Sequence, residues 1–237
     1  MLIKIFLFIL GICVGSFLNV IIGWLEQKRK NIFGRSFCDT CKKKLKFYDL
    51  IPVLSFLLLR GRCRYCQTKI KLEYLFVELA TGILFVLSGF NILLVFIAAL
   101  IIIFVYDLKH YLIPEIIILP AIILAGIFFW QNWLAMLIAS GFFAFLVLIS
   151  HETWMGWGDV KLAVLMGLLL GWPNILLALF ASFLFGAIIG VMLIVFNKKT
   201  MKSQIPFGPF LVGATIICLY LNHLHLLSFL WLWPLLA

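Results

Sequence analysis

Residues 162–197 read LAVLMGLLLGWPNILLALFASFLFGAIIGVMLIVFN, and none of these 36 residues is charged. As one helix the stretch would be about 54 Å long, whereas the hydrocarbon core of a bilayer is about 30 Å thick. The GWPN sequence at 171–174 combines turn-forming residues with an interfacial aromatic. The stretch therefore predicts two membrane-spanning helices joined by a tight turn.

The rest of the chain shows the same pattern. Residues 5–25, 79–106, 116–151 and 203–237 also lack Asp, Glu, Lys and Arg. The chain is 65% apolar and 12% charged, with a mean hydropathy of +1.21, whereas a soluble domain is roughly 45–50% apolar and 25% charged. These values exclude a soluble globular protein, a disordered chain and a collagen-like fibre. Unbroken apolar runs also argue against a transmembrane barrel, whose strands alternate. We expect an all-α polytopic membrane protein.

Turn signals divide the other long runs, at 88–91 (SGFN) and 130–133 (WQNW). The run at 5–25 is too long for a cleaved signal peptide, and no cleavage site follows it. About eight transmembrane helices result, at 2–25, 72–88, 91–106, 114–130, 133–150, 160–172, 174–196 and 208–222. Residues 223–237 are left open as a ninth span or as a re-entrant or interfacial segment.

The basic residues indicate the orientation. The net charge is +10, and 13 of the 19 Lys and Arg residues lie in 28–71, which indicates membrane topology rather than nucleic-acid binding. If this segment is cytoplasmic, eight spans place every basic residue except Lys4 on the cytoplasmic side. One long helix at 79–106 would put Lys109 and Lys161 outside, against the positive-inside rule. We therefore expect an N-terminus outside and three segments: a first transmembrane helix (1–25), a cytoplasmic loop (26–73) and a transmembrane core (74–237).

The cytoplasmic loop contains two C-x-x-C pairs, Cys38 with Cys41 and Cys63 with Cys66. Two such pairs can supply the four thiolates of a tetrahedral zinc site, which is structural because it has no open position. Disulfides and a redox dithiol are the alternatives, and a cytoplasmic location disfavours structural disulfides. We expect a zinc-stapled loop. The remaining cysteines, Cys13 and Cys218, are expected to be buried as small hydrophobes.

Asp107 and Asp159 stand out among the nine acids because each borders a long apolar run at the cytoplasmic end of a span. Two facing carboxyl groups that share a proton can activate water and polarise a scissile carbonyl. The alternative is a pair of interfacial carboxylates neutralised by Lys109 and Lys161. Glu78 lies one turn into the second span, and its role is left open. The other acids are expected to be solvated charges: Glu26, Asp39, Asp49, Glu73, Glu115 and Glu152.

Several motifs carry a resemblance to a known family. The GWGD sequence at 156–159, with an earlier aspartate on another span, resembles the intramembrane aspartyl proteases, and within them the bacterial type IV prepilin peptidases. GSFLNV at 15–20, the paired C-x-x-C, DLIP at 49–52, LRGRC at 59–63, IP at 113–114 and IPFGP at 205–209 follow in family order. The chain departs from the family at Gly23-Trp24, where a basic residue and a proline are usual, and at Asp39-Thr40, where proline is frequent.

The resemblance implies an enzyme of the bacterial inner membrane. It would cleave the short basic leader of prepilins or pseudopilins after glycine, on the cytoplasmic side, for type IV pilus assembly or protein secretion. It would use Asp107 and Asp159, with Gly156, Gly158, Lys161 and Pro206 in the active-site motifs. Members with the cysteine loop are typically also N-methyltransferases that use S-adenosylmethionine, but no glycine-rich nucleotide loop indicates where this cofactor would bind. The partners implied are the pilin substrates and the bilayer, and no nucleic acid.

Two other functions are open. Asp107 and Asp159 could carry protons or cations in a transporter, although no inverted repeat is visible, or the zinc loop could bind a partner in a receptor or scaffold.

Small residues recur every four positions on the first span, at Gly11, Gly15, Asn19 and Gly23, and Gly186 and Gly190 repeat the spacing. We expect these faces to pack closely against another helix; guidance of the substrate helix is the alternative for the first span. Pro206 and Pro209 are expected to break a helix near the cytoplasmic face.

Overall fold

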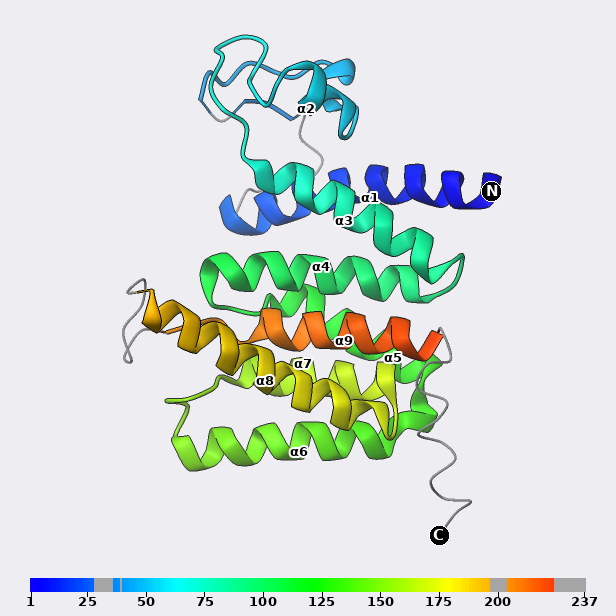
Figure 1. Ribbon diagram of the computed structural model, residues 1–237, viewed down its shortest axis with the longest axis vertical. Helices are drawn as coiled ribbons and strands as arrows, with labels where there is room; N and C mark the ends of the chain where they lie inside the picture. Colours follow the sequence, from blue (N-terminus) through cyan, green and yellow to red (C-terminus); the bar gives the residue numbers. More distant parts are fainter. Residues whose placement is uncertain (28–35, 39, 197–203, 224–237) are drawn as a thin grey trace. The chain divides into compact units, whose positions relative to one another are not determined.

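The computed structural model describes residues 1–27, 36–38, 40–196 and 204–223, and within them the protein is helical (Figure 1). Eight longer helices correspond to the eight expected spans, which confirms the fold class. The tail at 223–237 lies almost wholly outside the described residues. The elements are α1 (Leu2–Gln27), η1 (Phe47–Leu50), α2 (Leu54–Leu58), α3 (Leu72–Ser88), α4 (Leu93–His110), α5 (Glu115–Phe128), η2 (Trp130–Asn132), α6 (Trp133–Ser150), α7 (Trp157–Leu170), α8 (Asn174–Val195) and α9 (Gly208–His223).

Among the residues that the structure describes, four segments are long and apolar enough to cross a membrane by length and composition: Leu2–Glu26, Leu93–His110, Trp130–Ser150 and Asn174–Val195. Glu115–Phe128 and Gly208–Leu221 are shorter apolar helices. α3 and α7 are also short, with 17 and 14 residues.

The helix breaks fall at the expected turn signals. α3 ends at Ser88 and α7 at Leu170, and each is followed by a glycine with positive φ: +70° at Gly89 and +66° at Gly171. This backbone conformation is unfavourable for residues with a Cβ. The alternative prediction of a single long helix over 79–106 is therefore wrong.

The chain forms two compact units, 1–102 and 103–237. In the first unit α1 packs along α3. A Cβ built on Gly11 would lie 2.7 Å from Cα of Gly82, and one built on Gly15 would lie 2.8 Å from Cα of Glu78. The predicted close packing is thus confirmed for these two glycines. Gly23 differs, because a Cβ built there meets nothing within 4 Å.

In the second unit α7 contacts α5, α6 and α9, and α8 packs along α9 (Figure 1). An aromatic cluster joins α6, α8 and the start of α9: the ring centroids of Phe143 and Phe183 are 6.0 Å apart, and those of Phe183 and Phe207 are 5.0 Å apart. Because Phe207 immediately precedes α9, this cluster fixes where that helix begins. Pro206 lies before the helix, whereas Pro209 lies in its first turn, where a missing N–H costs little.

The two cysteines outside the loop differ. Cys218 on α9 is buried, as expected, whereas Cys13 on α1 is exposed at the protein surface. Hydropathy alone does not say which face of an apolar helix meets protein and which meets lipid.

Candidate active site and metal centre

Asp107 lies in the last turn of α4, because this helix continues to His110 instead of ending at the expected residue 106. Asp107 is only 5% exposed. Its carboxyl group accepts a hydrogen bond from the backbone N–H of Gly208, the first residue of α9. A Cβ built on Gly208 would lie 2.5 Å from Oδ2 of Asp107. Only glycine therefore lets the α9 N-terminus approach this carboxyl group without displacing it.

Asp159 is the third residue of α7, which begins at Trp157, earlier than the expected residue 160. The backbone N–H of Gly156, the N-cap residue, lies close enough to the carboxyl group of Asp159 to interact with it. An acidic side chain at this position commonly reaches back to the N-cap in this way. Gly158 packs against Ile113, with a built Cβ 3.3 Å from the Ile113 Cβ.

The second unit brings the two aspartates together. The carboxyl group of Asp107 is close enough to Asp159 for a direct electrostatic interaction, although the residues belong to different helices. One carboxyl group is held by the α9 N-terminus and the other by its own helix N-cap. The catalytic role of the pair stays a prediction.

Lys161 does not neutralise Asp159. Its Nζ forms an ion pair with Glu115, at the start of α5, and residues two apart on a helix do not face each other. The alternative in which Lys161 neutralises an interfacial carboxylate of Asp159 is therefore wrong. Glu152 accepts a hydrogen bond from the indole N–H of Trp157, at 2.6 Å.

The four loop cysteines form a compact cluster in the first unit. Their Sγ atoms all lie within 4.8 Å of one another, and those of Cys38 and Cys66 are 3.8 Å apart. Tetrahedral zinc with Zn–S bonds of about 2.3 Å requires sulfur atoms separated by about 3.8 Å. The geometry therefore fits a four-thiolate metal site.

The cluster is built from two copies of one backbone motif. The N–H of Cys38 donates to the carbonyl of Lys43, and the N–H of Cys63 donates in the same register to that of Thr68. The residue after each second cysteine has a positive φ, +56° at Lys42 and +57° at Gln67. The motif places both sulfur atoms of each pair on one side of a tight turn, which is what a shared ion requires.

Neighbouring groups shift the pKa values of the loop thiols in different directions. Hydrogen bonds from the side chain and backbone of Thr68 lower the pKa of Cys66 to about 6. At Cys41 a backbone hydrogen bond from Lys43 lowers the pKa as well, but burial and the neighbouring thiols outweigh it and raise the pKa to about 11. Neighbouring thiolates repel each other, so all four ionise together only when a cation compensates them.

Asp49 is not the solvated charge that the sequence suggested. It is 9% exposed, and it accepts hydrogen bonds from Nε of Arg64 at 2.7 Å and from the N–H of Lys46 at 3.2 Å. Burial alone would raise the pKa of Asp49, but the Arg64 and backbone hydrogen bonds outweigh it and hold the pKa below its usual value. Asp49 thus ties η1 to the turn that carries Cys63 and Cys66.

Glu78 anchors the loop to the helices. It is 8% exposed on α3, and its Oε2 accepts a hydrogen bond of 2.7 Å from the N–H of Val53. Val53 precedes α2 and has a strained φ of +61°. The buried carboxyl group therefore holds a loop conformation that the chain would not adopt alone.

Comparison with known proteins identifies the family. Residues 9–92 match the bacterial peptidase A24 N-terminal domain, and residues 94–191 match the type IV leader peptidase family. A prepilin leader peptidase/N-methyltransferase of Bacillus subtilis is 34% identical over 94% of this chain and 96% of its own length. The chain belongs to the type IV leader peptidase family.

Proteins of the same name in other bacteria agree. The protein of Legionella pneumophila is 34% identical over 89% of this chain and 88% of its own length. The protein of Vibrio cholerae is 33% identical over 90% of this chain and 94% of its own length. No solved structure matches this chain. The leader peptidase family is a protease family, so the predicted enzyme class is confirmed, and the transporter alternative has no support. The several apolar helices are consistent with the multi-pass inner-membrane protein expected.

Sequence reasoning missed two residues of these sites. Gly208 was part of the IPFGP motif, but only its contact with Asp107 reveals its importance. Asp49 was part of the DLIP motif, and a buried acid next to a basic cysteine turn was the available signal.

Proposed function

We propose that this leader peptidase cleaves the short basic leader of type IV prepilins and pseudopilins after glycine, on the cytoplasmic side. The observation that carries the proposal is the approach of Asp107 and Asp159 in one unit, each held by a backbone N–H. Membership of the protease family supports it. Gly156, Gly158 and Pro206 shape the backbone around the pair.

In the proposed reaction the two carboxyl groups share one proton, because two like charges at short range repel. The ionised carboxylate takes a proton from water while the water oxygen bonds to the scissile carbonyl carbon. The protonated carboxyl group donates to the carbonyl oxygen. Collapse of the tetrahedral intermediate breaks the C–N bond, and the departing amine takes up a proton. The Gly208 and Gly156 N–H groups keep both carboxyl groups in place throughout.

The relatives' names also support N-methylation of the new N-terminal residue. S-adenosylmethionine would supply the methyl group. Cys38, Cys41, Cys63 and Cys66 would hold one structural zinc ion, which would link the two copies of the cysteine motif through coordination bonds. The ion has no open coordination position in such a site and takes no part in cleavage.

One experiment tests both activities. Purified protein in detergent is incubated with a leader-bearing prepilin and S-adenosylmethionine, and the N-terminal mass of the product is measured. We expect loss of the leader after glycine and the added mass of one methyl group. An intact prepilin would refute the peptidase, and an unmethylated product would refute the methyltransferase.

The same proposal includes an orientation. Residues 26–73, 107–113, 151–160 and 197–207 would face the cytoplasm, with the N-terminus outside. A map of single-cysteine accessibility tests it. Labelling of residue 109 or 161 from the periplasmic side would contradict it.

A further inference from the structure

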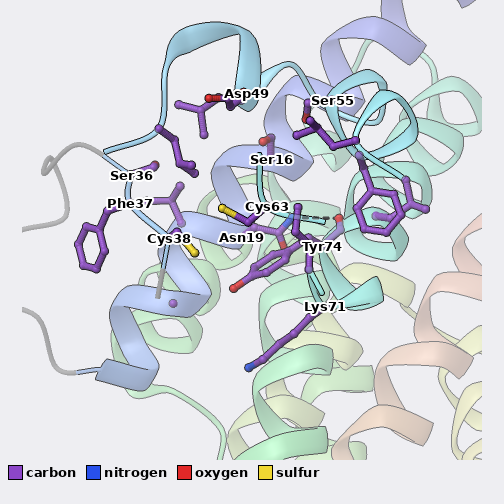
Figure 2. Close-up of a pocket in the computed structure, with 18 of the residues that line it drawn as sticks. Ser16, Asn19, Ser36, Phe37, Cys38, Asp49, Ser55, Cys63, Lys71 and Tyr74 are labelled. Carbon is purple, nitrogen blue, oxygen red and sulfur yellow. Dashed lines mark hydrogen bonds between the residues drawn. The ribbon is translucent and has the colours of Figure 1, made fainter. Parts of the chain in front are cut away.

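The first unit contains a cavity of about 440 Å³ between the cysteine loop and the helices α1 and α3 (Figure 2). Its size lies within the range of small-molecule sites, roughly 300–1,000 Å³. The loop supplies one wall, including Cys38 and Cys63, and the facing parts of α1 and α3 supply the others. The candidate aspartate pair belongs to the other unit.

Two buried polar atoms of α1 residues that line the cavity find no hydrogen-bond partner among the described residues. Asn19 donates through Nδ2 to the carbonyl of Tyr74 at 3.1 Å, which leaves its Oδ1 as an acceptor without a donor. Trp24 offers its indole N–H, a donor without an acceptor. Leaving such groups unpaired costs roughly 1–3 kcal/mol each. A ligand with both donors and acceptors would satisfy them.

The other lining groups define the chemistry of that ligand. Four aromatic residues line the cavity, and aromatic rings can stack on a nucleobase or contact a cation. The carboxyl group of Glu78 is buried, whereas the ammonium groups of Lys69 and Lys71 belong to exposed residues. The site therefore suits a molecule with an aromatic base, a cationic centre and a carboxylate. The aromatic lining residues are Trp24, Phe37, Phe56 and Tyr74.

We propose that this cavity is the S-adenosylmethionine site of the enzyme. This ligand combines adenine, a sulfonium cation and an amino acid carboxylate, and it carries donors and acceptors for Trp24 and Asn19. The inference rests on the proposed methyltransferase activity, and adds where its cofactor binds. It gives Gly23, which lines the cavity between those two residues, a function in keeping it open.

The test measures binding of radiolabelled S-adenosylmethionine to the purified full chain. Gly23→Leu fills the cavity without a backbone clash, because a Cβ there meets nothing within 4 Å. We expect it to weaken binding more than about 10-fold. Trp24→Phe keeps an aromatic six-membered ring but removes the N–H together with the five-membered ring of the indole, and we expect about 3- to 10-fold weaker binding. Gly126→Leu on α5 is the matched control, since its Cβ also meets nothing within 4 Å.

Retained zinc and retained leader cleavage show that each variant is folded. Wild-type binding in both Gly23→Leu and Trp24→Phe would overturn the site while leaving the methyltransferase intact. A wild-type protein that neither binds S-adenosylmethionine nor methylates a leader-free pilin would overturn the proposed methyltransferase itself, and the site with it. If the two variants instead lost affinity only for the leader-free pilin, the cavity would be a substrate site and the assignment would be wrong.

Discussion

Gly208→Ala adds a single methyl group beside the candidate catalytic pair. That Cβ would lie 2.5 Å from Oδ2 and 3.1 Å from Cγ of Asp107. To restore a separation of about 3.0–3.4 Å, the oxygen must retreat by about 0.5–0.9 Å. Catalytic groups tolerate errors of about 0.5 Å, and a misplacement of about 1 Å can cost roughly 100-fold in rate. We expect kcat/KM for leader cleavage to fall about 30- to 100-fold, equivalent to about 2–3 kcal/mol of transition-state stabilisation.

Gly213→Ala is the control on the same helix. A Cβ at Gly213 meets nothing within 4 Å, and both substitutions favour the helix intrinsically, by up to about 1 kcal/mol. The difference between the two variants therefore isolates the contact with Asp107. The assay is cleavage of a purified prepilin by detergent-solubilised enzyme, with methylation of a leader-free pilin as a second readout. If folded Gly208→Ala cleaved within threefold of the wild type, the α9 N-terminus would not position Asp107.

Three further predictions concern the aspartates and the loop. Asp107→Asn and Asp159→Asn should each abolish leader cleavage, and the double variant should be no slower than either, because the pair acts as a unit; substantial cleavage by one single variant would remove that residue from the mechanism. Replacing Cys63 with Ser should release about one zinc per chain, measured by elemental analysis, and should increase proteolysis of the loop more than that of the helices; a metal-free wild type with a stable loop would exclude the site. Because the folded pKa of Asp49 lies below its usual value, its contribution is fully present above the ordinary carboxyl pKa of about 3.9 and is lost as the pH falls through the lower, folded value. Hydrogen exchange should therefore show weaker loop protection in Asp49→Asn than in the wild type at pH 7, with the difference disappearing at strongly acidic pH; an equal difference at both pH values would mean that the charge is irrelevant.

The sequence by itself determined eight helical segments and the approximate positions of their ends. Helix length is limited by bilayer thickness, and turn formers such as Gly89 and Gly171 act locally, so the eight segments could be read without the fold. The four cysteines were also recognisable, because two local turns set the spacing of the ligands within each pair. The family motifs brought Asp107 and Asp159 forward for the same reason: they are short and contiguous.

Contacts between distant segments decided the rest. Whether Asp49 is solvated depends on the cysteine turn that places Arg64 beside it, and no local pattern records that packing. Gly11, Gly15 and Gly23 share one face of α1, yet only the first two meet α3, because α3 covers just part of that face. Gly208 belongs to α9 and Asp107 to α4, and the hydrogen bond between them exists only once the aromatic cluster around Phe207 has positioned the start of α9. The spacing of residues along one helix is a local property, whereas the neighbour that each residue meets is set by how the helices pack.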